Sequence, residues 1–514
     1  MTSRSLLPSI PFVLLLGACA TLPSSSSTSP ASDPAHARVA LRQSIDSMLA
    51  DPALRSASWG ILIVDPVAAE TLYAHNATKL LIPASNQKLV SSSVMLERLG
   101  PDYRYRTTFA VRGSASGDTI HGDLAVIGRG DPTTSDHMKG DAMQPLRDIA
   151  DSLTARGVRY ISGNVVAAGD AFPGPVAGSG WPWDALDQTS FAGVDELLFN
   201  EGLITLHVRA GARVGDSASV ETLPARTFPR IRNSVVTIAP VPDTGAAARR
   251  AATRRGWGRG SMGTRLSAWH DTSAAGVVVV DGSIAAGDSA AIIITQHDPD
   301  RAYVAALTEA LRERGITVAG QPARPGTERV DTMFTVQSVP LREILPMLLK
   351  PSQNQIAEAF LRTIGLEGTG VGTADSGRRV VERQFAEWKI APDGFVVRDG
   401  SGLSRSDYLA PEAVVGILDV MRRSPHFDLF YQSLPIAGVD GTIGNRMKGT
   451  PAENNLHAKT GTLQMVRSLS GYVYTADRRL LEFSILCNGW TAPQSEVDRV
   501  ADAIGVSLAS MRLR

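Results

Sequence analysis

Ser85 and Lys88 stand three residues apart, directly after Pro83-Ala84 and at the start of an apolar helical pattern. Residues three apart on an α-helix share one face, so the Lys88 amine can reach the Ser85 hydroxyl. A serine hydroxyl is a poor nucleophile until a base takes its proton, and a desolvated lysine can do this near neutral pH. The pair therefore predicts a helix N-terminus that presents a nucleophile, to which the fold must bring any partners.

Two further short motifs lie downstream in the chain. A Ser-Gln-Asn triplet at 352–354 directly precedes an amphipathic helical pattern, and a Lys-Thr-Gly triplet at 459–461 directly precedes two strand-like segments. Each motif alone is compatible with a structural role, as a helix turn, a helix N-cap or a turn. Lys-Thr-Gly is nevertheless rare in a chain with seven lysines. We therefore expect the three motifs to converge in one active site.

The three motifs, in this order, resemble those of the penicillin-recognising serine enzymes, which are penicillin-binding proteins and serine β-lactamases. A closer resemblance is to the class C low-molecular-mass penicillin-binding proteins of the D-Ala-D-Ala carboxypeptidase/endopeptidase family, which also carry a large insertion between the first two motifs. It covers nearly all of the chain from about residue 38. Gln353 is a small departure, because the family often has an acidic residue there. The segments that carry the resemblance are 83–88, 130–133, 352–358, 399–404 and 457–462.

This resemblance implies the catalytic roles. Ser85 would attack the carbonyl between two D-alanines to give an acyl-enzyme, and Lys88 would act as the base. Burial and the nearby charge of Lys459 would lower the pKa of Lys88. Ser352 would relay the proton to the leaving amine, and Asn354 would hold Lys88 and the peptide group of the substrate.

The resemblance also implies how the substrate is bound. Lys459 and Thr460 would bind the terminal carboxylate of the substrate. Gly461 would let the substrate backbone approach the strand edge, where the substrate can add as an extra strand. The backbone amides of Ser85 and Thr462 would form the oxyanion hole for the developing negative charge.

The function that these motifs predict is a serine-type D-Ala-D-Ala carboxypeptidase that acts on peptidoglycan stem peptides and is inhibited by penicillin and other β-lactams. Whether the same site also has DD-endopeptidase activity stays open. A serine β-lactamase is one alternative, disfavoured because the insertion is large and no clear deacylating glutamate follows the second motif. A catalytically inactive cell-wall-binding protein is another, disfavoured because the motif residues are intact.

The implied fold class is α+β: a penicillin-binding-protein/β-lactamase-like transpeptidase domain, with an antiparallel sheet flanked by helices, formed by residues 38–111 and 336–514. Short β-like segments punctuated by Gly, Asp and Pro predict a β-rich insertion at 112–335, which can hold one piece nested in another. The strands predicted in the catalytic domain are 58–64, 71–74, 468–475 and 480–488, and its predicted helices include 35–49, 342–349, 355–363, 377–388 and 411–422.

The N-terminus, residues 1–19, has the features of an export signal, with Arg4 before an apolar run at 6–16 that is too short to span a bilayer. The segment ending at Cys19 resembles a lipobox in which that cysteine is lipidated, but it also fits an ordinary signal-peptidase site. Lipidation is favoured because residues 20–37, rich in Ser, Pro, Thr and Ala, predict a disordered tether. We therefore expect a periplasmic protein attached to the outer membrane through Cys19.

Composition narrows the remaining function classes. The 514 residues include 51 basic and 51 acidic side chains, which removes the electrostatic argument for a nucleic-acid partner. The nine histidines lack local metal-ligand spacing, and no glycine-rich phosphate loop is evident, so we expect neither a metal nor a cofactor. His457 is a weak alternative base, because no Gly-x-Ser-x-Gly elbow accompanies it. Asp131-Pro132 can be either functional or an ordinary turn, and 399–404 either lines the cleft or is an architectural turn.

Overall fold

The computed structural model describes residues 34–224, 228–240, 263–320 and 330–513. The predicted export signal at 1–19, including Cys19, therefore lies outside the described residues. The predicted tether was to reach residue 37, but helix α1 (Pro34–Leu49) already begins at Pro34. Proline suits the first turn of a helix, where its missing N–H would have no helical acceptor. Arg38 then fastens this turn by an ion pair with Glu70 (Nε–Oε1 2.6 Å).

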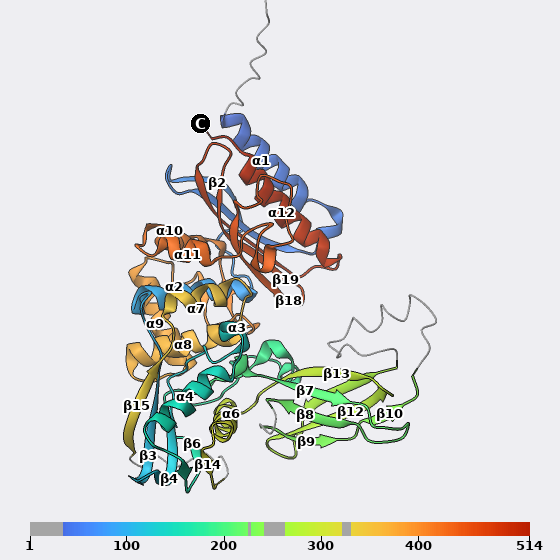
Figure 1. Cartoon of the computed structure of the whole chain (residues 1–514). Coiled ribbons are helices and arrows are strands. Elements are labelled where there is room, and N and C mark those ends of the chain that lie inside the picture. Colours follow the sequence, from blue (N-terminus) through green and yellow to red (C-terminus); the bar gives the residue numbers. More distant parts are fainter. Residues whose placement is uncertain (1–33, 225–227, 241–262, 321–329, 514) are drawn as a thin grey trace, which may run out of the picture.

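The catalytic domain is built on an antiparallel sheet to which both ends of the chain contribute (Figure 1). The strand order is β18-β19-β20-β1-β2, and β1 pairs with β20 over seven residues from Ser58 opposite Asn488. Helices α1 and α12 (Gln494–Ser510) cover one face, where Ile45, Ile61 and Ile504 are fully buried in a shared apolar core. The strands are β1 (Ser58–Asp65), β2 (Glu70–His75), β18 (His457–Leu463), β19 (Val466–Tyr474) and β20 (Leu480–Asn488).

A helical layer covers the other face of this sheet. Its core is formed by buried apolar side chains from six helices, among them Val94, Phe360 and Leu418. The four helices predicted between 342 and 422 are confirmed, as are the four predicted strands. The helices of this layer are α2 (Gln87–Leu99), α7 (Leu341–Leu349), α8 (Asn354–Thr369), α9 (Ala374–Glu387), α10 (Pro411–Arg423) and α11 (Phe427–Ser433).

The insertion consists of an outer module and a nested one. The outer module is a mixed sheet with the order β14-β5-β4-β3-β15, with β6 beside β4, and it packs on helices α4 and α6. The predicted boundaries at 112 and 335 cut through β3 and β15. These strands form one hydrogen-bonded pair, which places the edges of the insertion at 106 and 337. The elements are β3 (Arg106–Ser116), β4 (Thr119–Ile127), α3 (Asp136–Lys139), α4 (Gln144–Ala155), β5 (Tyr160–Ile161), β6 (Val165–Ala167), α6 (Pro299–Glu313), β14 (Thr317–Val318) and β15 (Asp331–Gln337).

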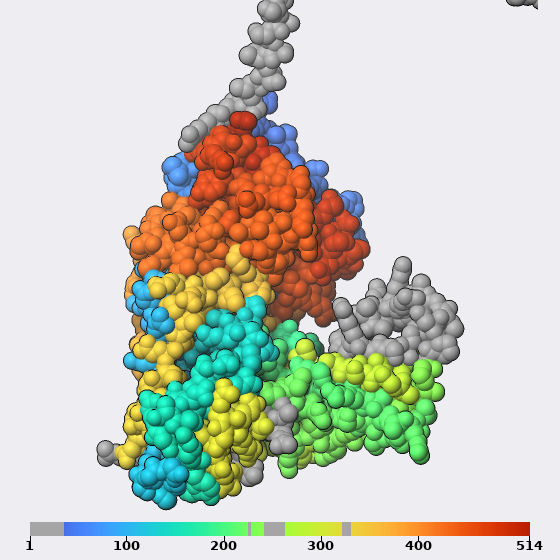
Figure 2. Space-filling view, viewed as in Figure 1, coloured from blue at the N-terminus to red at the C-terminus, as the bar shows by residue number. Residues whose placement is uncertain are grey.

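The nested module is a β-sandwich that projects as a lobe to one side of the molecule (Figure 2). One sheet has the order β13-β7-β8, and the other the order β10-β12-β11 with β9 beside β12. Leu206, Val280 and Ile292 come from both sheets and share one buried core. The strands are β7 (Leu203–Arg209), β8 (Ser219–Leu223), β9 (Arg230–Asn233), β10 (Val236–Ile238), β11 (Arg265–His270), β12 (Val277–Ala285) and β13 (Ser289–Thr295).

The fold class predicted from the sequence is confirmed: an α+β transpeptidase-like domain with a large, β-rich and nested insertion. Among the described residues, none of the helices has the length and apolar character that a membrane span requires. Cys487 is a buried free cysteine in β20, in the strand position predicted for it.

Candidate active site

Ser85 lies on a short 3-10 turn, η2 (Ala84–Asn86), that leads directly into α2. The turn is held against β18 and β19. The Asn86 side chain donates to the Lys459 carbonyl (2.8 Å), and the Ser468 hydroxyl donates to the Pro83 carbonyl (2.8 Å). The helix therefore begins at a fixed position beside the strand that carries the third motif, with the Ser85 side chain partly exposed.

Lys88 is fully buried one helical turn after Ser85, as the three-residue spacing predicts. Its Nζ lies 3.0 Å from Ser85 Oγ, 2.6 Å from Asn354 Oδ1 and 2.7 Å from the Ser401 carbonyl. Burial lowers the pKa of Lys88 to about 7, although the carboxylates of Asp399 and Glu358 oppose this shift. A lysine in this environment is available as a neutral amine near pH 7.

The partners of Lys88 determine how a neutral amine is oriented. A neutral amine has two hydrogens and one lone pair. The Asn354 Oδ1 atom and the Ser401 carbonyl are acceptors only, so both hydrogens are directed toward them. The lone pair is then left for the Ser85 hydroxyl, which is the arrangement that proton abstraction requires.

The second motif is placed by the start of α8. Asn354 is the first residue of this helix, and its amide group also donates to the Ser190 carbonyl (2.9 Å). Gln353 caps the helix through its side-chain oxygen, which accepts from the Ile356 amide (2.7 Å). This contact explains why an amide suffices where the resembling family often has an acid.

Ser352 precedes this cap in the left-handed backbone region (φ 65°) and lines a cavity of about 220 Å³ together with Ser190 and Asn354. Within the described part of the chain, the hydrogen bonds of the site do not join the Ser352 hydroxyl to Ser85 or Lys88. The proton relay assigned to Ser352 therefore stays a prediction.

The third motif lies on β18, beside the Ser85 turn. Lys459 is fully buried, and burial together with the nearby charge of Lys88 places its pKa well below the usual lysine range. The Thr460 hydroxyl lies 2.6 Å from the Thr442 hydroxyl, and Thr462 is exposed further along the strand. The expectation that the Lys459 charge lowers the pKa of Lys88 is wrong: repulsion between the two side chains lowers the pKa of Lys459, whereas burial is what lowers the pKa of Lys88.

Gly461 is required by the packing of β18 against its neighbours. A Cβ atom there would lie 2.1 Å from Ser468 Oγ, 2.5 Å from the Pro83 carbonyl and 3.0 Å from the Ser85 amide nitrogen. Glycine is needed because the strand packs against the backbone of the nucleophile turn. The predicted role of Gly461 in the approach of the substrate backbone is compatible with this packing and stays a prediction.

A layer of buried carboxylates supports the site, and the sequence motifs did not assign it a role. Glu358 accepts from the Ser401 amide (2.8 Å), and Asp399 accepts from the amides of Gly402 and Ser404 (both 2.6 Å). These contacts fix the loop 399–404, so that the Ser401 carbonyl points at Lys88. Burial raises the pKa of Glu358 to about 7, and the negative charge of the neighbouring Asp399 contributes to this rise. The sequence left open whether this loop lines the cleft or is an architectural turn. The contact between the Ser401 carbonyl and Lys88 supports the first alternative.

The insertion also reaches the site. The Trp181 indole donates to Asp399 Oδ2 (2.9 Å), and its ring meets Phe191 edge-to-face at 5.5 Å. Trp181 and Ser190 both belong to the irregular segment that precedes the sandwich. Aromatic residues and glycines cluster in this part of the sequence, but that pattern alone does not indicate these contacts.

Two of the open alternatives now have structural explanations. His457 stacks on Tyr431 at 3.9 Å, and its Nδ1 lies 3.0 Å from the carbonyl of the same tyrosine. Among the described contacts it has no hydrogen bond with Ser85, which argues against a role as base. Asp131 accepts from the Thr133 amide (2.9 Å), the contact of an ordinary Asx turn.

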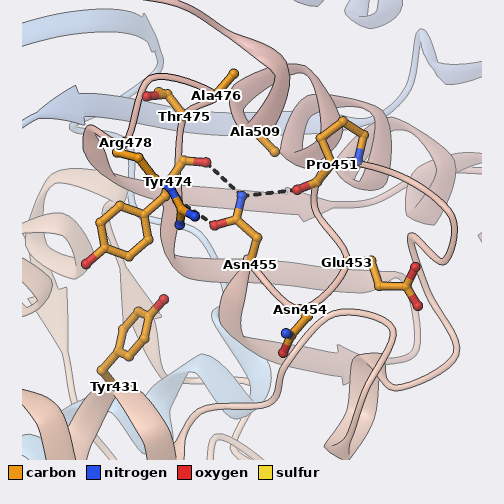
Figure 3. A pocket seen from close by; sticks show the side chains of 10 residues that line it. All are labelled: Tyr431, Pro451, Glu453, Asn454, Asn455, Tyr474, Thr475, Ala476, Arg478 and Ala509. Carbon is orange, nitrogen blue, oxygen red and sulfur yellow. Dashed lines mark hydrogen bonds between the residues drawn. The ribbon is translucent and has the colours of Figure 1, made fainter.

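A larger cavity, of about 530 Å³, lies at the far end of β18 and β19 (Figure 3). Asn455 organises one wall by donating to the carbonyls of Pro451 (3.1 Å) and Tyr474 (2.7 Å). None of the motif residues lines this cavity. Cavity size therefore does not identify the site; the smaller cavity is lined by Ser352 and Asn354, and Asn354 contacts Lys88.

Comparison with known proteins agrees with this geometry. Residues 41–510 match the D-Ala-D-Ala carboxypeptidase 3 (S13) family. The chain belongs to this family. Among relatives of this S13 enzyme, a D-alanyl-D-alanine carboxypeptidase of Actinomadura sp. (strain R39) is 32% identical over 486 residues, which are 91% of this chain and 84% of the relative. The D-alanyl-D-alanine carboxypeptidase DacB of Haemophilus influenzae is 23% identical over 82% of this chain and 83% of its own length.

A solved structure shows the same fold. The crystal structure of penicillin-binding protein 4 (dacB) from Haemophilus influenzae superposes with a TM-score of 0.76 at 20% identity, covering 91% of this chain and 99% of that one. The predicted family is confirmed, and with it the enzyme class: the S13 protein is a serine-type D-Ala-D-Ala carboxypeptidase, a hydrolase.

Proposed function

We propose that this carboxypeptidase acts on the stem peptides of peptidoglycan through an acyl-enzyme on Ser85, with Lys88 as the base. The observation that carries the proposal is the set of three contacts at Lys88 Nζ. They hold a neutral amine with its lone pair toward the nucleophile, and burial keeps the pKa of that amine near 7.

The proposed reaction has two steps. Ser85 Oγ attacks the carbonyl between the two D-alanines, its proton passes to Lys88, and the ester forms as the C–N bond breaks. The proton then reaches the leaving amine through Ser352, so that the terminal D-alanine departs with a neutral amine. Water hydrolyses the ester in the second step, which restores the Ser85 hydroxyl.

The third motif supplies the binding and electrostatic parts of the proposal. The terminal carboxylate of the substrate pairs with Lys459 and the Thr460 hydroxyl, and its negative charge raises the pKa of the buried lysine back toward the charged form. The amides of Ser85 and Thr462 stabilise the tetrahedral oxyanion. Recognition of a C-terminal carboxylate is what distinguishes a carboxypeptidase from an enzyme that cleaves internal peptide bonds.

The test uses a peptide that ends in D-Ala-D-Ala and a labelled penicillin, with the wild-type chain and Ser85→Ala. We expect release of D-alanine and stable labelling by the wild type, and neither by the variant. Ser93→Ala is the matched control, because this buried serine on the same helix donates within α2 to the Leu89 carbonyl (2.6 Å). Absence of D-alanine release by the wild type would refute the proposal, whereas rapid turnover of penicillin would favour the β-lactamase alternative.

Inhibition by β-lactams is part of the same proposal. A β-lactam presents a strained amide and a carboxylate to the groups that bind a D-alanyl peptide, so Ser85 is expected to be acylated by it. A solved Haemophilus influenzae penicillin-binding protein 4 is described in complex with a novel β-lactam. Conversion of cross-linked muropeptides into monomers, measured in parallel, tests for DD-endopeptidase activity, because cleavage of a cross-link releases two stem peptides and no free D-alanine.

We also propose that the chain is exported and held at the outer membrane through a lipid on Cys19. The support is the sequence alone: an apolar run at 6–16, a lipobox-like segment ending at Cys19 and a polar stretch after it. Metabolic labelling with a radioactive fatty acid should mark the wild type and not Cys19→Ala. Labelling of neither protein, with a mature N-terminus other than residue 19, would refute lipidation.

A further inference from the structure

Three potential metal ligands meet where the irregular segment of the insertion touches the sandwich. Asp187, His270 and His297 each present a ligand atom, and these atoms lie within 4.8 Å of one another. His270 ends β11 and His297 follows β13, whereas Asp187 lies between the short turns η3 (Trp183–Ala185) and η4 (Thr189–Phe191). The three residues come from separate segments, which is why local histidine spacing predicted no metal.

The two imidazole rings are stacked, and their Nε2 atoms point toward neighbouring backbone carbonyls. Their ring centroids are 3.6 Å apart with a 15° tilt. His270 Nε2 lies 2.9 Å from the Thr295 carbonyl, and His297 Nε2 lies 3.2 Å from the Leu186 carbonyl. The Thr295 hydroxyl in turn donates to that Leu186 carbonyl (2.6 Å). Both ring nitrogens therefore face the same small polar region.

This polar region has three acceptors, the carbonyls of Thr295 and Leu186 and the Asp187 carboxylate, and three donors, the two imidazole Nε2–H groups and the Thr295 hydroxyl. His297 Nε2 faces the Leu186 carbonyl and also Asp187 Oδ1 at 3.1 Å, but one N–H can satisfy only one of them well. The Asp187 Oδ1 atom is buried, and its contact with His297 Nε2 is an ion pair only while that imidazole is protonated. A buried carboxylate oxygen beside two imidazoles needs a positive charge, and a metal cation can supply that charge when both imidazoles are neutral.

We propose that Asp187, His270 and His297 form a Zn²⁺ site. Two imidazoles and one carboxylate are a donor set that suits Zn²⁺, with bonds of about 2.0–2.2 Å. Ligand atoms within 4.8 Å of one another need to move together by about an ångström to meet such an ion, and the stacked imidazoles must also turn so that the ion lies in both ring planes. Water or a nearby carbonyl completes a tetrahedral shell. This proposal goes beyond the carboxypeptidase activity and does not depend on it.

The location gives the ion a consequence for the catalytic cleft. Asp187 lies three residues before Ser190, whose carbonyl accepts from the Asn354 amide (2.9 Å). The other two ligands belong to the sandwich. Bound Zn²⁺ would therefore tie the segment that lines the cleft to the sandwich. The ion is a structural clamp in this proposal and takes no part in the hydrolysis.

The experiment titrates zinc sulfate into the full chain, stripped of metal by a chelator, and follows the heat of binding. We expect one ion per chain and a rise in the thermal unfolding midpoint. His297→Gln and Asp187→Asn should each weaken binding by at least about tenfold, because each removes one of three protein ligands. His297 is exposed, so its variant is expected to fold normally. X-ray absorption should show imidazole and carboxylate ligands at about 2.0–2.1 Å.

The matched control is His207→Gln, a partly exposed histidine on β7 of the same sandwich, which should bind zinc as the wild type does. The proposal is overturned if the wild type binds no zinc, or if His297→Gln and Asp187→Asn bind it as tightly as the control. An absorption spectrum without imidazole ligands would overturn it as well.

Discussion

The protonation of Lys88 should set the lower limit of the working pH range. With the ordinary lysine pKa of 10.5, about one amine in three thousand would be neutral at pH 7, whereas a pKa of about 7 leaves about half of them neutral. This difference corresponds to about 5 kcal/mol in favour of the neutral base. The lowered pKa means that the active, neutral form predominates above pH 7 and is lost as the pH falls.

The assay is the second-order rate of acylation by labelled penicillin between about pH 5 and pH 9, which reports the free enzyme. We expect a plateau above pH 7 and a decline of about tenfold per pH unit below it. Glu358→Gln should move the midpoint to lower pH, because the Glu358 charge raises the pKa of Lys88. Glu367→Gln, a change of a carboxylate that pairs with Arg129 instead (3.0 Å), should leave the midpoint in place.

Thermal unfolding measured over the same pH range distinguishes protonation of Lys88 from unfolding of the protein as the cause of a slower reaction. A flat profile with intact protein, or a midpoint near 10, would show that Lys88 does not act as a buried neutral base. The hydrogen bonds of Lys88 Nζ would then serve only to stabilise the fold.

Three further changes test other parts of the site. Gly461→Ala should slow acylation at least tenfold and lower the unfolding free energy by about 1–3 kcal/mol through overpacking at the Ser85 turn, whereas Gly416→Ala, where a Cβ would meet Ile390 at an ordinary 3.4 Å, should do neither. Lys459→Ala should abolish the preference for a peptide that ends in a carboxylate over its C-terminal amide, and an unchanged ratio of kcat/KM values would contradict the assigned role. Trp181→Phe removes the N–H that donates to Asp399 and should cost about 1.5–3 kcal/mol in chemical denaturation; no loss would show that the insertion does not brace the site.

The site residues that could be predicted from the sequence are those proposed to act through their side chains. The three-residue spacing of Ser85 and Lys88 forces them together on any helix, and the structure keeps them 3.0 Å apart. The contact of Ser401 with Lys88 could not be predicted from the sequence, because it is made by the backbone carbonyl, which every residue type has. Its position depends on buried amide–carboxylate contacts formed only after folding, such as the one with Glu358.

The boundaries of the insertion were missed for a related reason. Amino-acid composition changes gradually along the chain. The edge of the insertion, in contrast, is set by the pairing of Arg106 in β3 with Gln337 in β15, which lie more than two hundred positions apart in the sequence. Local pattern identifies strands but does not show which ones close a module. The strand-like segments of the nested sandwich were visible in the sequence. The contacts that the preceding irregular segment makes with the cleft through Ser190 and Trp181 were not, because they depend on tertiary packing.

The pairing of β1 with β20 has a consequence for the order of folding. The catalytic sheet contains the first and the last strands of the described chain, so it cannot close until synthesis has reached Asn488. The sandwich, bounded by Leu203 and Thr295, has its own core and can fold while the remainder is still being made. Contacts of such large sequence separation form slowly. A pulse-labelled chain should therefore acquire a protease-resistant insertion before it acquires the ability to bind penicillin.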